Sequence, residues 1–141
     1  MTLAAATAFL IASAAPAPAP SPGAKPIADT GTTMDGQPLA LPQAPVRVVA
    51  TRVELPAGAT VPTHMHIWAR YVYVESGEVQ LTLAGSGATR TFKAGEMIVE
   101  PIGKWHSGRI VRDTVLVAVE QVPPGRCNTI RPSEAGKAND C

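Results

Sequence analysis

The fold is decided by residues 58–83, which read GATVPTHMHIWARYVYVESGEVQLTL. Tyr71–Val74 is a run of β-branched and aromatic residues, and Val79–Leu83 alternates apolar and polar residues with a period of two. Both patterns are typical of β-strands. The polar, glycine-containing stretch Glu75–Glu78 between them predicts a tight turn. We therefore expect two short strands joined by that turn.

Similar runs continue on both sides of this stretch, most of them followed by Gly or Pro. They are Val46–Leu55, Thr89–Phe92, Met97–Glu100, Ile110–Val111 and Val115–Val119. Short strands that recur about every eight to twelve residues are typical of a β-sandwich or β-barrel. No stretch after residue 15 shows a helical period. The sequence thus predicts a single all-β domain over residues 46–122, as a chain of 141 residues allows.

The charge pattern argues against nucleic acid as a partner. The formal net charge is +1 with the histidines neutral, and the Lys and Arg residues are scattered along the chain. Surfaces that bind nucleic acid instead gather basic residues, often with aromatic residues among them. The sequence also lacks a G-x-S-x-G elbow, a glycine-rich phosphate loop and a C-x-x-C pair. We do not expect the functions that depend on these features.

The first residues resemble an export signal. Leu3–Ala12 is apolar but too short to span a bilayer, and the small residues after it allow cleavage after Ala14. No Lys or Arg precedes the apolar run, so the usual positive charge must come from the amino terminus or from residues upstream. We predict a signal peptide over residues 1–14, no transmembrane anchor, and a periplasmic or secreted protein. A disordered Ala-rich tail is the alternative.

Residues 15–45 form a proline-rich linker. Eight of the fourteen prolines fall between Pro16 and Pro45, which excludes a regular helix or a central strand. We interpret this segment as an extended tether. Loose packing on the domain from Thr30 onward is the alternative.

The C-terminal tail, residues 123–141, is polar and turn-rich and contains both cysteines, Cys127 and Cys141. In an oxidising compartment these two thiols are expected to pair. The disulfide would close a loop of about 15 residues and contribute roughly 3 kcal/mol in the chain-entropy model. Free or intermolecular thiols are the alternative.

The chain has only three histidines: His64, His66 and His106. The i, i+2 spacing of the first two puts both rings on one face of a strand, with Cα atoms about 6.6 Å apart. Two such imidazoles can converge on one metal ion at about 2.0 to 2.2 Å, and a third must come from another strand. Because isolated histidines more often serve packing or solvent contact, the spacing alone makes the metal site a hypothesis.

The surroundings of these histidines resemble the two sequence motifs of the cupin family. The first motif is matched by Gly58, five residues, His64, Met65, His66 and then Gly77. The second is matched by Gly95, five residues, Pro101, one residue, Gly103, two residues and His106. The resemblance covers residues 46–122 and includes both glycine-to-histidine spacings.

This resemblance implies a barrel of antiparallel strands, the double-stranded β-helix or jelly roll. It implies that His64, His66 and His106 meet inside the barrel around a divalent metal ion, which would be Fe, Mn, Zn, Ni or Cu. It also implies a homodimer, because cupins commonly pair through strand edges. An empty barrel with three packed histidines is the alternative.

One position departs from the cupin pattern. Where the first motif usually has a Glu ligand, this sequence has Arg70, whose guanidinium stays charged and cannot bind a metal. Arg70 either grips a carboxylate, phosphate or enolate of a bound ligand or pairs with a carboxylate of the barrel wall. The candidates for that pairing are Glu75, Glu100 and Glu120. Glu100, directly before Pro101, is also the best candidate for a substitute ligand.

Four aromatic residues are further candidates for ligand contacts. Trp68 and Trp105 flank the histidines in sequence and line either the pocket mouth or the barrel core. Tyr71 and Tyr73 alternate with valines, so their hydroxyls share one face of the sheet and either could bond a ligand.

Three imidazoles leave positions open on a metal ion, as oxygen activation or bidentate ligand binding requires. By resemblance, we expect a metal-dependent oxygenase that acts on a small acidic or enolisable substrate. A non-catalytic barrel that binds or senses a metal or a small-molecule ligand is the alternative. A structural dimer module with an unused site is a third interpretation. The sequence leaves both an enzyme and a binding protein open.

Overall fold

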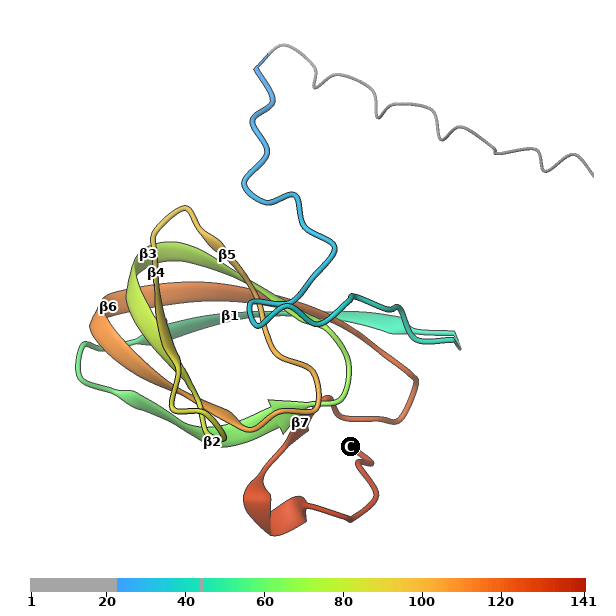
Figure 1. Cartoon of the computed structure of the whole chain (residues 1–141). Helices are drawn as coiled ribbons and strands as arrows, with labels where there is room; N and C mark the ends of the chain where they lie inside the picture. The colour runs from blue at the N-terminus through green and yellow to red at the C-terminus, as the bar shows by residue number, and fades with distance from the viewer. Residues whose placement is uncertain (1–22, 44) are drawn as a thin grey trace, which may run out of the picture.

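The computed structural model describes residues 23–43 and 45–141. The expected signal peptide and the linker up to residue 22 lie outside the described residues. The described part is built from antiparallel strands, with one short 3-10 turn near the C-terminus (Figure 1). The elements are β1 (Arg47–Leu55), β2 (Thr60–His66), β3 (Arg70–Leu83), β4 (Thr89–Lys93), β5 (Met97–Val99), β6 (His106–Val122), β7 (Thr129–Ile130) and the 3-10 turn η1 (Pro132–Glu134). Within these described ranges, no helix is long and apolar enough to cross a membrane.

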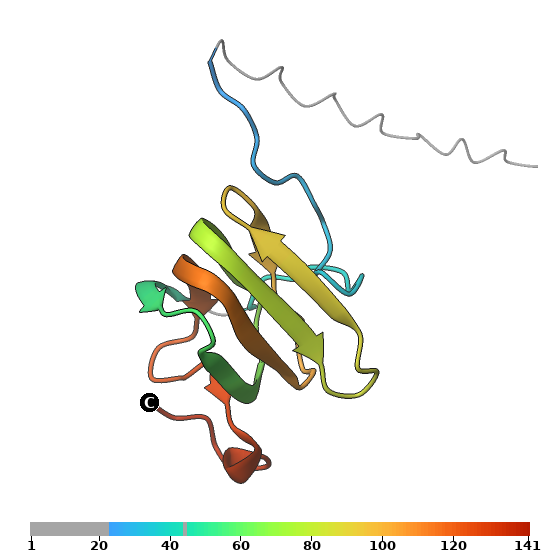
Figure 2. The same cartoon turned by 90° about the vertical axis from the view of Figure 1, so that its left-hand side faces the viewer.

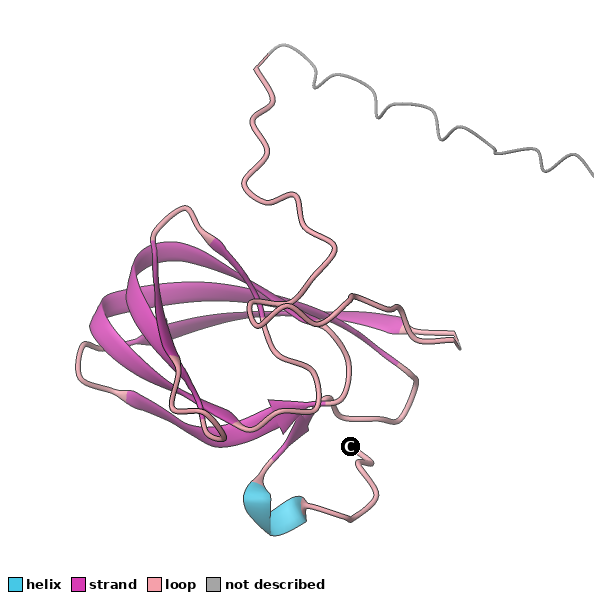
Figure 3. Cartoon of the chain, in the orientation of Figure 1, coloured by secondary structure: helices cyan, strands magenta, loops and turns pink. Residues whose placement is uncertain are grey.

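The two longest strands, β3 and β6, belong to both layers of the barrel. The first half of β3 pairs with β5 and with the second half of β6, which in turn pairs with β1. The second half of β3 pairs with β4 and with the first half of β6, which pairs with β2. Figure 2 shows β4, β3, β6 and β2 side by side in this second layer. The predicted all-β jelly-roll barrel is therefore confirmed, and Figure 3 shows its strands joined by loops, with one short helical turn outside the barrel.

The turn predicted at Glu75–Glu78 is wrong, because β3 runs through it without interruption. The strand bends there instead, and its register against β6 shifts. Gly77 allows the bend: its φ is +83°, and a Cβ atom there would lie 2.1 Å from the carbonyl oxygen of Asp113 on β6. The hydroxyl of Thr114 accepts a bond from the amide of Glu78 and donates one to its carbonyl oxygen. β3 and β6 thus both pass from one layer of the barrel to the other at this bend.

The hydrophobic core lies between the two layers. Alternate residues of β3 face it, as the period of two predicts for strands. Its members are Val72, Val74, Val79, Leu81, Phe92, Ile98, Ile110 and Ala118. Each fully buried Val, Leu, Ile or Phe side chain contributes about 1.5 to 3 kcal/mol, so this cluster is a main source of the barrel's stability.

The segment before β1 contacts the barrel. The amide of Met34 donates to the carbonyl oxygen of Val99 at 2.8 Å. The side-chain amide of Gln37 both donates to and accepts from the backbone of Ile102, at 2.9 Å each. The proline-rich segment is therefore more than a tether, and from about Thr30 it packs on the domain.

The C-terminal tail is also held against the barrel. Cys127 and Cys141 form the expected disulfide. Directly after Cys127, β7 pairs with β2 opposite Met65 and His66. Figure 1 draws the loop that follows in red, below β2 and β7. This places the tail next to one of the candidate metal ligands.

Candidate metal centre

Three histidine side chains converge inside the barrel. β2 carries His64 and His66 two positions apart, and His106 begins β6 directly opposite His64. The ring centroids lie 4.4 to 5.2 Å from one another, and all three residues are buried. The structure thus brings together the three histidines that the sequence singles out.

Backbone carbonyls orient two of these rings. Nδ1 of His64 donates to the carbonyl oxygen of Pro62 at 2.8 Å, and Nδ1 of His106 donates to that of Lys104 at 2.9 Å. Because a carbonyl oxygen can only accept, the proton sits on Nδ1 and the Nε2 lone pair is left for a metal. Burial lowers the pKa of His64 to about 4 and also lowers the pKa of His106. Both rings are therefore neutral at pH 7, as ligation requires.

Glu100 joins the histidines as a fourth potential ligand. It is buried directly after β5, and its Oε2 lies 2.8 Å from Nε2 of His66. Burial raises the pKa of Glu100, but the neighbouring His66 and the positive charge of Arg70 outweigh burial and lower it. The carboxylate is therefore ionised at neutral pH. One donor atom from each of the four side chains lies within 4.8 Å of the others.

These donor atoms fit a metal ion better than they fit one another. Nε2 of His66, Nε2 of His106 and Oε2 of Glu100 are buried. Although the first and third of these atoms lie 2.8 Å apart, none of the three has a hydrogen-bond partner of proper geometry among the described residues. Buried polar atoms without partners are rare and costly, and one divalent ion would satisfy all three. Opposite ligands of such an ion lie about 4.0 to 4.4 Å apart, so the group closes on it with shifts of about half an ångström.

Arg70 and Glu100 are neighbours across the β3–β5 ladder. The amide of Glu100 donates to the carbonyl oxygen of Arg70 at 2.9 Å. The guanidinium of Arg70 lies 3.6 Å from Glu100 and 3.9 Å from Glu120, and the side chain is 22% exposed. The carboxylate beside the three histidines is thus that of Glu100, directly after β5, and position 70 carries a guanidinium. Glu75 is not the partner of Arg70; it pairs with Arg52 instead.

The loop before His106 is held from two sides. The amide of Gly103 donates to the carbonyl oxygen of His66 at 2.7 Å, which ties the loop to β2. On its other side, Lys104 pairs with Asp35 of the segment before β1. These contacts position His106 relative to the β2 histidines. The sequence does not predict the contact between Lys104 and Asp35, because the segment before β1 is interpreted from its sequence as a tether.

The tail reaches the centre as well. The hydroxyl of Thr129 on β7 lies 3.4 Å from both Nδ1 of His66 and the guanidinium of Arg70. The side chain of Asn128, almost fully buried, donates to the carboxylate of Glu120 at 3.0 Å. Sequence reasoning missed both residues, and the cysteine pair was the only signal that the tail is held in place.

A cavity of about 390 Å³ is lined by two of the four donor side chains, His64 and Glu100. Its polar lining includes His64, Arg70 and Glu100, together with Thr129 and Arg131 of the tail. The rest of the wall is mostly apolar and includes Val53, Leu55, Val72, Val79, Leu81, Ile98, Leu116 and Ala118. A cavity of this size and composition suits a small organic ligand that carries a polar group.

The four aromatic candidates lie elsewhere. Of the described residues that line the cavity, none is Trp68, Trp105, Tyr71 or Tyr73. Because Val72 faces the interior, the tyrosines on either side of it point to the outer face of the sheet. These four side chains therefore do not line this cavity, and their contact with a ligand stays a prediction.

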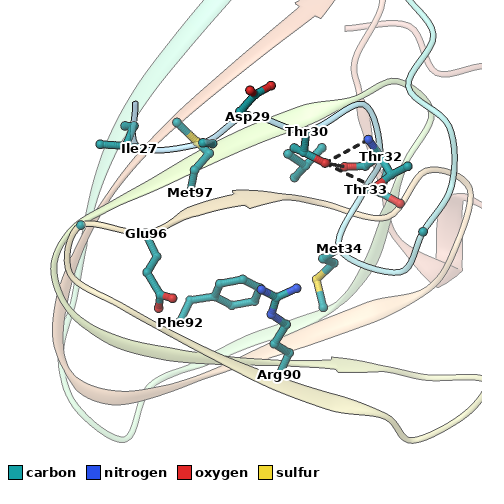
Figure 4. Close-up of a pocket in the computed structure, with 14 residues that line it drawn as sticks. Ile27, Asp29, Thr30, Thr32, Thr33, Met34, Arg90, Phe92, Glu96 and Met97 are labelled. Carbon is teal, nitrogen blue, oxygen red and sulfur yellow. Dashed lines mark hydrogen bonds between the residues drawn. The ribbon is translucent and has the colours of Figure 1, made fainter. Parts of the chain in front are cut away.

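A second cavity, of about 510 Å³, lies between the segment before β1 and strands β4 and β5 (Figure 4). Figure 4 shows Arg90 beside Phe92, and the guanidinium lies 4.7 Å from the centroid of that ring. The described residues that line this cavity include no histidine. Of the four candidate ligands, His64 and Glu100 line the first cavity, and none lines this second one.

Comparison with protein families gives one match. A family model described as "Cupin domain" matches residues 51–122, just over half of the chain. No curated protein matches the chain.

Several solved structures are similar to part of the chain. A conserved protein of unknown function from Streptococcus pyogenes is 25% identical, with a TM-score of 0.48 over 55% of this chain and 65% of its own. The polyketide cyclase RemF from Streptomyces resistomycificus is 28% identical, with a TM-score of 0.47 over 57% of this chain and 60% of its own. The DMSP lyase DddQ from Ruegeria pomeroyi DSS-3 is 21% identical, with a TM-score of 0.51 over 64% of this chain and 45% of its own. Each match spans less than two thirds of the other protein, and the likeness to DddQ shows the fold alone.

Proposed function

The chain belongs to the cupin family, and on that basis we propose that it binds one divalent metal ion and, beside it, a small acidic ligand. The metal ligands would be His64, His66, His106 and Glu100. The observation that carries this proposal is the set of buried donor atoms that have no hydrogen-bond partner in the part of the chain that the structure describes. Neutral imidazoles with one carboxylate suit Fe, Mn, Zn, Ni or Cu.

The leading reaction class is oxygenation of a small acidic or enolisable substrate. A redox-active ion such as iron would supply oxygen activation at this centre. The chain's own residues would do the rest: the apolar wall keeps water from the substrate, and Arg70 holds its acid group in one orientation.

A non-catalytic barrel that binds or senses a metal or a small ligand is the second candidate. One observation favours it: of the described residues that line the cavity, Glu100 is the only acid. If Glu100 ligates the metal, no carboxylate is left to act as a general base. Turnover would then have to rely on the metal and Arg70 alone.

Metal content is the first test of this proposal. Protein matured in the periplasm and purified without chelators or metal-affinity steps is expected to contain close to one equivalent of metal by inductively coupled plasma mass spectrometry. The His64→Ala/His106→Ala variant removes two of the four ligands and is expected to contain none. Lys93→Ala, an exposed change on β4, serves as the matched control. Iron would call for oxygen-consumption assays next, and zinc for ligand screening.

The proposal fails if neither protein contains metal and neither takes up Fe²⁺, Mn²⁺, Zn²⁺, Ni²⁺ or Cu²⁺ on titration. Circular dichroism of each sample separates lost ligation from lost folding. Equal metal content in the wild type and the histidine variant would place the metal elsewhere on the chain.

Export and dimer formation belong to the same proposal. Among the described strands, β1 pairs only with β6, and its Val48 is 65% exposed. A free strand edge with exposed apolar residues is suited to pairing with a second chain. In periplasmic preparations, we expect intact-mass spectrometry to find the chain cleaved after Ala14. We expect light scattering to find a dimer, and the Val48→Lys variant to dimerise more weakly. An uncleaved chain would contradict export, and a monomer at high concentration would contradict the dimer.

A further inference from the structure

The residues around the cavity form layers along the strands. Arg70 on β3 is bonded through its carbonyl oxygen to the amide of Glu100. Two positions further along the same strand, Val72 stands opposite both Ile98 and Ala118. Residues on one face of a strand are two positions apart, so the two layers are separated by about 7 Å. A charged layer beside the metal position thus gives way to an apolar one.

The charges near this layer favour a ligand with a single negative charge. Arg70 faces Glu100 and Glu120, and Arg131, at the edge of the cavity, pairs with Glu134. The formal charges of these two arginines and three carboxylates leave one net negative charge. A divalent ion would turn this into one net positive charge. A monoanion would then neutralise the site, whereas a neutral ligand would leave a buried charge uncompensated.

Arg70 has donor capacity to spare for such an anion. Its Nε is buried facing Glu100, whose nearest oxygen, 3.6 Å away, is too far for a hydrogen bond. The donors available to a ligand in the cavity are therefore those of the terminal nitrogens. One terminal nitrogen makes only a long contact, 3.4 Å, with the hydroxyl of Thr129. A guanidinium with free donors is well suited to a carboxylate, which accepts two parallel hydrogen bonds.

We propose, on the basis of the proposed metal site, that the ligand is a monocarboxylate with a compact apolar body. Its carboxylate would lie between the four metal ligands and Arg70, and its body against Val72, Ile98 and Leu116. Inorganic phosphate lacks the apolar body, and a dicarboxylate carries one charge too many. The ligand class thus follows from the order of the layers and from the charge count.

Calorimetric titration of the zinc-loaded protein with benzoate, benzamide and acetate tests this inference. Benzoate is expected to bind at least about tenfold more tightly than benzamide, which lacks the charge, and than acetate, which lacks the apolar body. Arg70→Gln is expected to remove the preference for benzoate over benzamide without reducing zinc content. Arg112→Gln, an exposed change on β6 outside the cavity, is expected to leave the preference intact.

The outcomes separate this inference from the proposal on which it rests. Equal affinities for benzoate and benzamide in zinc-loaded protein would overturn the ligand class and leave the metal site standing. A benzoate preference that survives Arg70→Gln would overturn the role of Arg70. Failure of the same samples to take up zinc or another divalent ion would overturn the metal site, and the inference with it.

Discussion

Replacement of Glu100 by glutamine is expected to lower the affinity for a divalent metal ion at least about a hundredfold, the upper end of what even outer-shell partners contribute. Glu100 is the only negatively charged member of the four-residue group. Its loss would remove a ligand and leave the nearby guanidinium of Arg70 to repel the ion. Competition with a fluorescent zinc chelator measures the affinity directly.

A second test of this prediction moves the carboxylate from position 100 to position 70. Their backbones are hydrogen-bonded across the β3–β5 ladder, so either side chain can approach the histidines. The double variant Arg70→Glu/Glu100→Gln returns the carboxylate to the usual cupin position and is expected to recover most of the lost affinity. Glu120→Gln, which changes a carboxylate near Arg70 but outside the ligand group, serves as the control. Wild-type affinity in Glu100→Gln would show that Glu100 is not a ligand.

Replacement of Gly77 by alanine is expected to destabilise the barrel by about 3 kcal/mol or more. The cost has two parts. The φ of Gly77 is +83°, which an L-residue adopts only with strain, and the new Cβ would lie 2.1 Å from the carbonyl oxygen of Asp113. Because both long strands bend here, the backbone cannot move away without breaking pairs of the ladder. Urea unfolding in the presence of a chelator measures the effect without a contribution from metal binding.

Gly58→Ala is the matched control for this change. Gly58 has nearly the same φ, +82°, but a Cβ atom there would meet nothing within 4 Å. It is therefore expected to lose only the conformational part, about 1 to 2 kcal/mol. Equal losses in the two variants would show that the close approach to β6 does not matter, and that the bend tolerates a side chain.

The bend at Gly77 also shows where local sequence stops being informative. Glu75–Glu78 has the composition of a tight turn, and nothing in the stretch itself distinguishes a turn from a bent strand. The difference lies in β6, which pairs with β3 on both sides of the bend. The partner residues are more than thirty positions away in the chain, so their effect appears only after folding.

The candidate metal site also has one part that local sequence predicts and another that only the folded structure decides. The i, i+2 spacing of His64 and His66 places both rings on one face of a strand, and strand geometry alone requires this. The match to His106 depends on motif spacing, which is likewise readable from the chain. From the sequence, Glu100 is only the best of several candidate carboxylates, because its distance to His66 depends on how β5 is aligned with β3.

By itself, the sequence determined the strand pattern, the cupin motifs and the three histidines, because each depends on near neighbours or on a short fixed spacing. Only the tertiary structure decided that Glu100 lies among the three histidines, and that the tail brings Thr129 to the cavity that Glu100 lines. Those contacts join strands that are far apart in the chain. Their register is set by packing across the whole barrel, which no local pattern encodes.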